Sequence, residues 1–468
     1  MFFTRALNKR KVKRSLERTF KKLLVKRRKE RKANRRRGRN MGPELPMELL
    51  DMIMYHNHED KAALMASSMV SSQWQGPAQR RLFHSIKITI GYDHTPPDCE
   101  LGFYFEFFSD VPTLGAFVAT LHISAAHRFT RSLLADSDST IARLVGVLPT
   151  LQLLSFENIS STPRGSPQTG SLLIKNLTLR SISSINMRKA DQQEFLKLFS
   201  VQETLELNLT YVSAPNGGPH IARSMPVRHL KIKNSLDCFP CFDRGTSFPR
   251  LRALSFDVTN VGRGNLFNLD PLQLITNSTL IHYYDKMNRF MRRYGANLEF
   301  FRLNMRHLIT AVVALEDRQW TVFQLDAVCP NLQSLHIGFE LGLKTGGSLE
   351  PLLMSELTCT IDFLITIISS APRTLTTVVF GISMTLSPPG ESDKKPPADT
   401  VAETNRQWKR LAQALEPARF GRLTAVRFVQ PQVRSSLSEF KEPLDPVYQQ
   451  LLAGNFENLN KKGLLCFE

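Results

Sequence analysis

Three stretches of the chain repeat one phrase: LPTLQLLSF (148–156), FPRLRALSF (248–256) and CPNLQSLHI (329–337). Each has the form P-x-L-x-x-L-x-apolar, and looser copies occur farther along and between them. The central apolar residues of the nine copies are Leu154, Leu177, Leu205, Leu230, Leu254, Phe301, Leu335, Val378 and Val426. The first copies are 23 to 28 residues apart and the later ones 34 to 48, so the chain carries an internal repeat whose spacing lengthens toward the C-terminus.

The repeat predicts the fold. A short strand with alternating apolar residues cannot bury its face alone, so the copies are expected to stack in parallel and share one core. The early spacing matches the period of a leucine-rich repeat, about 20 to 29 residues. Helix-periodic stretches at 191–200, 286–295 and 404–415 would cover the other side. We predict an α/β solenoid with short parallel strands and helices on its convex side, with separate β-α units in a doubly wound sheet as the alternative.

The repeat departs from the regular form at one position. A regular leucine-rich repeat places asparagine three residues after the second strand apolar residue, where it bonds neighbouring turns. That position here holds Ile159, Ser235, Thr259, Arg306 and Glu340. We therefore predict an irregular solenoid without a continuous asparagine ladder. The outward residues expected on its concave face are chemically mixed and name no ligand; they include Gln152, Arg252, Gln333 and Thr376.

Residues 44–75, ELPMELLDMIMYHNHEDKAALMASSMVSSQWQ, predict a helical unit ahead of the solenoid. Apolar residues follow Pro46 at helical spacing, and an acidic pair ending at Asp60 suits the positive end of a second helix. Trp74 opens a third segment, in which Pro77 should break or restart the helix. Three short helices in about 45 residues bury too little to stand alone, so this unit must lean on the next domain, on a partner, or on both.

The order and spacing of these residues resemble the F-box domain, in particular its version in the expanded fungal sets. The matching segments are Leu45-Pro46-x-Glu48-Leu49-Leu50-x-x-Ile53, Leu64-x-x-x-Ser68-x-Val70-Ser71-x-x-Trp74 and Ala78-x-x-x-Leu82-Phe83-x-x-Ile86. Met69 stands where a leucine is common in that family.

The resemblance implies that the unit docks onto the small adaptor subunit of an SCF-type cullin–RING ubiquitin ligase, while the C-terminal region captures the protein to be ubiquitinated. A leucine-rich-repeat-like region after an F-box is a familiar pairing in that family. A plain helical cap on the solenoid is the alternative for the unit. The residues that the resemblance assigns to adaptor binding are Leu45, Pro46, Glu48, Leu49, Ile53, Leu64, Val70, Ser71 and Trp74.

Other features that could suggest chemistry are incomplete. His56-x-His58-Glu59-Asp60 lies in a hinge and lacks the distant ligands that a metal site needs. Cys238 and Cys241 form a lone C-x-x-C with no second pair. The sequence contains no phosphate-binding loop, nucleophile elbow, dinucleotide glycine fingerprint or H-E-x-x-H zinc motif. We therefore predict a non-enzymatic substrate receptor without catalytic residues, cofactor or metal.

The net charge is concentrated at the N-terminus. Residues 1–40 hold 19 Lys or Arg against Glu17 and Glu30, so they carry +17 of the net +19 and the rest of the chain is nearly neutral. Such a tail suits a nuclear-import signal, a contact with RNA or an acidic membrane, a mitochondrial presequence, or a solvated segment with no partner. A nucleic-acid-associated or nuclear scaffold protein acting through this tail is the alternative to the receptor.

The cysteines, the start of the chain and its hydropathy limit where the protein is expected to work and which partners it is expected to have. The six cysteines have no framework spacing, the start of the chain lacks a signal peptide, and no run of about 18 apolar residues could span a membrane. We expect a nuclear or cytoplasmic protein whose partners are the adaptor, an unknown target protein, and an import receptor or polyanion at the tail. The predicted parts are the basic tail (1–40), the F-box-like domain (41–90), a connecting or capping segment (91–144), the solenoid (145–435) and a C-terminal tail (436–468).

Overall fold

The structure is a computed structural model. The residues that it describes are 45–90, 97–125, 138–157, 172–180, 199–208, 223–233, 246–257, 287–304, 324–343, 350–386, 398–416, 418–429 and 446–467. The basic tail, the Cys238 and Cys241 pair, and the residues at the asparagine position other than Glu340 lie outside them. The side chain of Glu340 is likewise not described.

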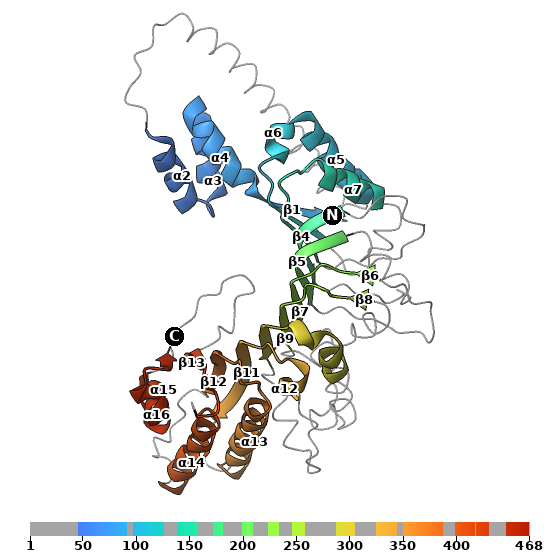
Figure 1. Cartoon of the computed structure of the whole chain (residues 1–468). Helices are drawn as coiled ribbons and strands as arrows, with labels where there is room; N and C mark the ends of the chain where they lie inside the picture. The colour runs from blue at the N-terminus through green and yellow to red at the C-terminus, as the bar shows by residue number, and fades with distance from the viewer. Residues whose placement is uncertain are drawn as a thin grey trace, which may run out of the picture.

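Within the described residues, twelve strands form one sheet, and their order in the sheet follows the sequence (Figure 1). The strands are β1 (Ser85–Ile90), β2 (Thr120–Ala125), β3 (Leu153–Glu157), β4 (Leu172–Arg180), β5 (Phe199–Asn208), β7 (His229–Lys233), β9 (Ala253–Asp257), β10 (Phe300–Asn304), β11 (Ser334–Leu343), β12 (Thr377–Leu386), β13 (Ala425–Val429) and β14 (Leu465–Phe467). All their pairings are parallel. A separate parallel pair joins β6 (Arg223–Ser224) to β8 (Thr246–Ser247).

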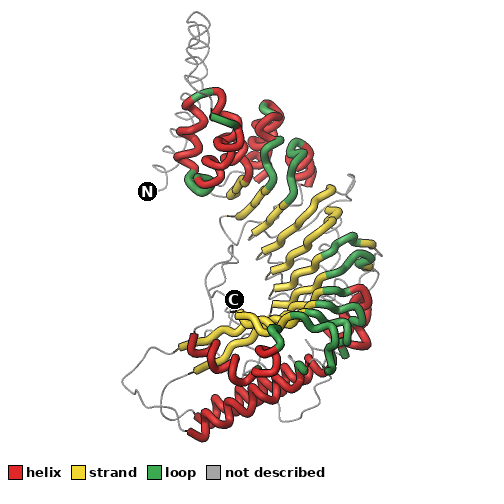
Figure 2. The backbone as a smooth tube through the Cα atoms, turned by 60° about the vertical axis from the view of Figure 1, so that its left-hand side comes forward, coloured by secondary structure: helices red, strands yellow, loops and turns green. Residues whose placement is uncertain are grey.

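Helices precede the sheet and lie along its outer side. They are α2 (Met47–His56), α3 (Lys61–Val70), α4 (Ser72–His84), α5 (Pro97–Asp110), α6 (Pro112–Gly115), α7 (Asp138–Gly146), a helix described over 287–294, η2 (Gly295–Asn297), α12 (Leu325–Val328), α13 (Glu350–Ser369), α14 (Ala398–Ala414), α15 (Pro446–Asn455) and α16 (Glu457–Lys461). Figure 2 shows the strands stacked in an arc, with the connecting loops and helices outside it.

Two of the three predicted convex helices are present. The helix over 287–294 corresponds to the predicted stretch 286–295, and α14 contains most of 404–415. The third stretch, 191–200, ends in strand β5, because Phe199 and Ser200 already pair with β4, and its first eight residues lie outside the described part. No described helix is long and apolar enough to cross a membrane.

The nine central residues of the sequence repeat occupy one position in the sheet. Each pairs in register with the next, from Leu154 on β3 to Val426 on β13, and all nine are fully buried. The row continues to Leu121 on β2 and Leu465 on β14. Because the strand order never reverses, the sheet has no switch point of the doubly wound kind. The predicted α/β architecture with stacked parallel strands is confirmed.

The sheet extends past both predicted limits of the solenoid. Strands β1 and β2 lie before residue 145, in segments predicted as the F-box-like domain and the connecting segment, and β14 lies after residue 435. The sequences SIKITI and TLHISA alternate in polarity but lack the proline and leucine phrase of the later copies. Pairing with β3 fixes β2 in the sheet, and pairing with β2 fixes β1.

Polar side chains link consecutive turns of the solenoid. Thr150 Oγ1 donates to the carbonyl oxygens of Ala116 and Val118, at 2.8 and 3.1 Å. Thr374 Oγ1 makes the same pair of contacts one turn back, 2.9 Å from Pro330 O and 2.9 Å from Leu332 O. Thr150 and Thr374 both lie four residues before a central apolar residue. This position supplies inter-turn hydrogen bonds of the kind an asparagine ladder makes in a regular repeat.

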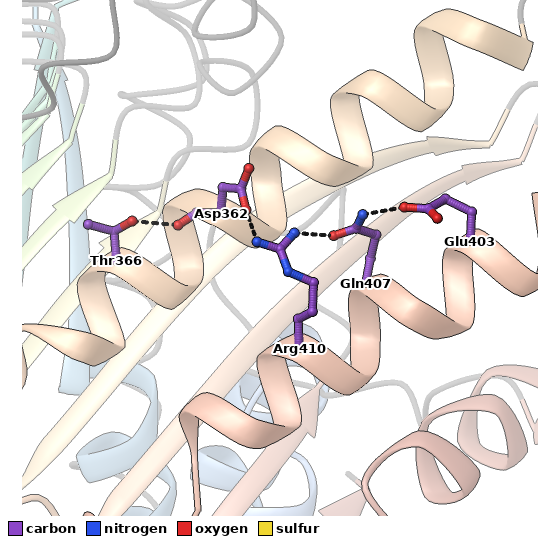
Figure 3. Close-up of polar contacts among 5 residues, drawn as sticks. All are labelled: Asp362, Thr366, Glu403, Gln407 and Arg410. Atoms are coloured by element: carbon purple, nitrogen blue, oxygen red, sulfur yellow. Dashed lines mark hydrogen bonds and ion pairs between the residues drawn. The ribbon is translucent and has the colours of Figure 1, made fainter.

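Helices α13 and α14 are joined by a chain of polar contacts (Figure 3). Arg410 Nη2 lies 2.7 Å from Asp362 Oδ1, and Arg410 Nη1 donates to Gln407 Oε1 at 2.6 Å. Gln407 Nε2 in turn donates to Glu403 Oε1, and Thr366 Oγ1 donates to Asp362 O at 2.6 Å. The chain links the two helices on their outer side, while the apolar side of each helix faces the core.

Candidate protein-interaction surface

Local sequence signals set the starts of the three N-terminal helices. Pro46 precedes α2 with φ −53°, a value that its ring favours and that suits the entry to a helix. The side chain of Asp60 caps α3 by accepting a hydrogen bond from Ala63 N at 2.9 Å. Ser71 caps α4 in the same way, accepting from Trp74 N at 3.4 Å. The predicted helix start at the acidic pair is confirmed.

Helix α4 runs without interruption through Pro77, so the predicted break at this proline is wrong. Pro77 has no amide to donate to Gln73 O, which removes one helical hydrogen bond. Burial of Pro77 and Ala78 and the packing of Phe83 hold the helix beyond this point. Tertiary contacts therefore override a local signal that weakens the helix but does not end it.

The three helices share a very small core. Met54, Leu64 and Ala78 are its buried members, and Trp74 and Leu82 pack against them. So small a core does not stabilise an independent domain. Helix α4 leads directly into β1 without a linker.

The last turn of α4 belongs to the main core. Phe83 stacks on Phe107 of α5 with a centroid distance of 6.5 Å, and Phe83 and Ile86 both pack against the solenoid core. The helical unit is thus built onto the N-terminal end of the sheet, which is one of the two supports that the sequence analysis left open for it.

Exposed apolar side chains gather on α2 and α3. Ten large apolar side chains of the described residues are exposed, and nine of them lie between residues 45 and 70. Contiguous apolar surface on a soluble protein marks a binding site more often than chance exposure does. We call this set the apolar helical face: Leu45, Met47, Leu49, Met52, Ile53, Tyr55, Met65, Met69 and Val70.

Most of the predicted adaptor-binding residues are exposed. Leu45, Leu49 and Val70 have exposed fractions of 39, 45 and 68%, and Ile53 lies beside them on α2. The polar or cyclic members of the set are exposed as well: Pro46, Glu48 and Ser71. Leu45 O also accepts a hydrogen bond from Gln73 Nε2 at 2.6 Å, which ties the start of α2 to α4.

Two predicted contact residues have a different place. Leu64 is fully buried between the helices, and Trp74 packs against the same core. A side chain with no exposed surface cannot touch a partner in this conformation, so Leu64 supports the apolar helical face from beneath. Sequence reasoning missed Met47, Met52 and Met65, whose exposure depends on how α2 and α3 rest on α4.

The His-rich hinge makes local contacts. His58 Nδ1 lies 2.7 Å from Tyr55 O, and the His58 ring stacks on Tyr55 with centroids 5.6 Å apart. Among the described side chains, no cluster of three or more His, Cys, Asp or Glu residues could hold a metal ion. Among the described residues, Cys329 and Cys466 are free thiols.

The concave face of the sheet is a second extended surface. Strand alternation places the residues one before, one after and three after each central apolar residue on it. The residues that sequence reasoning assigned to this face, among them Gln152 and Arg252, instead precede the strands. They lie at the rim, where Gln152 N donates to Ala119 O and Arg252 N to Arg228 O. The assignment was wrong because each of these residues lies two positions before a central apolar residue, and strand alternation puts that position on the core side and not on the concave side.

One polar cluster on the concave face has the composition of a hydrolase triad. His122 Nδ1 lies 3.0 Å from Ser155 Oγ, and His122 Nε2 lies 3.0 Å from Glu157 Oε2. A nucleophile must be accessible to its substrate, but Ser155 is 5% exposed. Strand β3, which carries Ser155 and Glu157, is hydrogen-bonded to β2 on one side and to β4 on the other. The cluster therefore cross-links β2 and β3 and satisfies their buried polar groups.

The fold and these two surfaces define a repeat protein of α/β type, with a helical unit at the N-terminal end of a parallel-strand solenoid. Solenoids of this kind offer long concave surfaces for binding. No family model matches the chain, and no curated protein matches it. A solved structure described as "Crystal structure of Rad7 and Elc1 complex in yeast" is similar at 8% identity over 84% of this chain and 90% of that chain. Its TM-score is 0.26.

Proposed function

We propose that this chain is the substrate receptor of an SCF-type cullin–RING ubiquitin ligase. In this proposal the apolar helical face binds the adaptor subunit, and the concave face of the solenoid binds the protein to be ubiquitinated. Other subunits carry out ubiquitin transfer, so the chain itself acts by proximity and performs no chemistry. It would work in the nucleus or the cytoplasm.

The concentration of exposed apolar side chains on α2 and α3 is the observation that carries the proposal. Leu49, Met52 and Ile53 recur at helical spacing on one side of α2, and Val70 ends α3. Burying such side chains against a partner would remove apolar surface from water at about 25 cal/mol per Å². The F-box-like order of residues in 45–86 supplies the class of partner.

The alternative of a plain helical cap accounts for the packing of α4 against the sheet. It does not account for the apolar helical face, because a cap presents a polar outer side to water. The two roles are compatible, since α4 carries the contact with the solenoid while α2 and α3 carry the exposed apolar residues.

Capture of the purified adaptor by the full chain tests the proposal. Wild-type protein is expected to retain the adaptor, and Leu49→Asp/Val70→Asp is expected to weaken retention by more than about tenfold. Both side chains are exposed, so the variant should keep its circular dichroism spectrum and melting temperature.

Phe103→Asp is the matched control. Phe103 on α5 is the exposed large apolar side chain of the described residues that lies outside the apolar helical face. Its replacement introduces the same charge and should leave adaptor capture within about twofold of wild type. Equal capture by wild type and by the double variant, or no capture by either, would show that the receptor proposal is wrong.

The charge of residues 1–40 favours a second candidate, a nucleic-acid-associated protein acting through its tail. The tail carries +17 of the net +19. Binding to RNA or DNA by such a tail should weaken steeply between about 50 and 200 mM salt, because each phosphate contact releases counterions. Deleting residues 1–40 should abolish this binding and leave adaptor capture unchanged. Salt-insensitive binding, or binding that survives the deletion, would exclude this role for the tail.

A further inference from the structure

A row of polar side chains crosses the middle of the concave face. Lys231 on β7 pairs in register with Ser255 on β9, and Ser255 pairs with Arg302 on β10. Each residue directly follows a central apolar residue, so its side chain is on the concave side. Ser255 and Lys231 are partly exposed, and Arg302 is exposed.

The two cations of this row have no carboxylate partner among the described residues. The nearby ion pairs involve other lysines and arginines, such as Lys233 Nζ with Glu206 Oε1 at 3.2 Å. Glu206 is the register partner of Lys231 on β5 but its carboxylate is paired with Lys233, and Asp257, next to Lys233 in the register, is the other carboxylate beside the row. On these three strands, positive side chains that face the concave side outnumber negative ones. On β2 and β3 of the same face, in contrast, His122 Nε2 lies 3.0 Å from Glu157 Oε2.

The pKa of His229 is affected by the positive charges beside the row. Burial is the main cause that lowers the pKa of His229, and the charge of Lys231 lowers this pKa further. Glu203 acts in the opposite direction, and Arg228 again lowers it. His229 directly precedes the central residue of β7, on the concave side and next to Lys231.

We propose that the row Lys231–Ser255–Arg302 binds an acidic segment of a partner protein, which lies extended across the strands. Neighbouring strands are about 4.8 Å apart, so Lys231 and Arg302 are separated by about 10 Å along the solenoid. An extended chain covers that distance in about three residues. In the polyproline II form of an extended chain, side chains three residues apart lie on the same side about 9 Å apart, so acidic side chains at this spacing would meet both cations, with the Ser255 hydroxyl between them.

Neighbouring side chains favour a peptide over a small anion. Phe300 on β10 lies beside Arg302 on the same face and its ring is 4.5 Å from that of His336. The face continues past Asn304, whose side chain fills the space beside Gly338 on β11, to Gly381 on β12, which is partly exposed and has no side chain to separate a peptide from the strand backbone. Aromatic and backbone groups beside paired cations suit a peptide with both apolar and acidic residues.

This binding proposal depends on the proposed function in one respect: it identifies the partner as the protein that is ubiquitinated. Its test uses the full chain and three synthetic peptides of about twelve residues, a length that spans several strands. One peptide has aspartate at every third position, one has asparagine there, and one has phosphoserine there. Binding is measured by fluorescence anisotropy at low and at physiological salt.

The decisive variant is Lys231→Gln/Arg302→Gln, and its matched control is Arg292→Gln/Arg373→Gln. The control removes two exposed arginines that lie off the concave face. Binding of an anionic peptide to the basic tail is the same in both proteins, so their difference reports the concave face. We expect the decisive variant to bind the aspartate peptide at least tenfold more weakly than wild type, and the control to stay within about twofold.

A local measurement accompanies the binding curves. An acidic peptide bound on the row should raise the pKa of His229, because the negative charge of the peptide opposes the positive charge of Lys231. This pKa is measured by NMR, and the His229→Gln variant assigns the signal. Binding at the tail leaves this pKa unchanged. Binding of the phosphoserine peptide alone, with loss in the decisive variant, identifies phosphoserine as the source of the anion.

The proposal is overturned if the decisive variant binds like the control, or if the asparagine peptide binds as tightly as the aspartate peptide. Adaptor capture by the same proteins separates this outcome from failure of the proposed function. Lys231 and Arg302 lie far from the apolar helical face along the sheet, so the decisive variant should capture the adaptor normally. Loss of peptide binding with intact adaptor capture would show that the row binds the acidic segment and has no part in adaptor binding.

Discussion

Asn304 on β10 and Gly338 on β11 are register partners, and the Asn304 side chain fills the space beside Gly338. A Cβ atom at position 338 would lie 2.6 Å from Asn304 Oδ1 and 2.9 Å from Asn304 Cγ. Asn304 is 3% exposed, and its Oδ1 has no hydrogen-bond partner among the described atoms. The glycine is therefore required by its neighbour and not by its own backbone conformation.

The first prediction is that Gly338→Ala lowers the free energy of unfolding by about 1 to 3 kcal/mol, because the buried amide of Asn304 has no room to move. Combining it with Asn304→Ala should recover most of the loss, since the clashing atoms are removed. Urea unfolding of the single and double variants measures this coupling. Gly102→Ala is the control: nothing lies within 4 Å of a Cβ there, and alanine suits the middle of helix α5. A loss for Gly338→Ala that the second substitution leaves unchanged would contradict this account.

The second prediction compares two residues of helix α14. Trp408 is 3% exposed and packs against Phe428 and Phe456, so Trp408→Ala should cost about 3 to 5 kcal/mol. Arg410 pairs with Asp362, but their side chains are 40 and 50% exposed, so Arg410→Ala should cost at most about 1 kcal/mol. Thermal unfolding at low and high salt distinguishes the two, because only the ion pair is screened. A larger loss for Arg410→Ala would mean that the polar chain of Figure 3, and not apolar packing, holds α14 in place.

The third prediction concerns the hydrogen bonds between turns. Thr374→Val keeps the shape of the side chain but leaves Pro330 O and Leu332 O without this donor. We expect a loss of about 1 kcal/mol in the free energy of unfolding. Thr366→Val is a useful comparison, because Thr366 Oγ1 bonds within its own helix and its loss should matter less. Equal losses for the two variants would show that the hydrogen bonds between turns stabilise the fold no more than a hydrogen bond within one helix.

The fourth prediction is a pH dependence. Burial raises the pKa of the Cys329 thiol from its ordinary value of 9.0 to about 12. The unfolded chain therefore loses this proton first, and stability that is present below pH 9 is lost progressively as pH rises toward 12. Between pH 9 and 10 the loss should be about 1 kcal/mol.

Cys329→Ala tests this dependence. The variant is less stable at every pH because packing is lost, but its stability should fall less between pH 8 and 10 than that of wild type. Parallel slopes for the two proteins in urea unfolding would assign the alkaline loss to other groups.

The amino-acid sequence determined the architecture because every copy of the repeat must bury the same side. A central residue such as Leu254 could be placed in the core from its phrase alone, and the structure buries it in register with its neighbours. Strands β1 and β14 could not be placed in this way. Their sequences carry the alternation but not the phrase, and only pairing with a neighbouring strand defines them.

In the helical unit, too, some features could be predicted from the sequence and others depended on tertiary packing. Sequence signals located the helix starts, as at Asp60, because a cap acts over a few residues. They could not tell that Leu64 is buried while Val70 is exposed, since both are apolar residues of one helix. The contact between α3 and α4 decides which side is covered, and the packing of Pro77 and Phe83 decides that α4 continues.

The sequence by itself therefore determined the repeated strand, its buried side and the order of the parts, because these follow from the period of apolar residues along the chain. Only the tertiary structure decided which surfaces remain open. The apolar helical face and the row Lys231–Ser255–Arg302 each bring together residues from different elements, and such a surface exists only once those elements have packed.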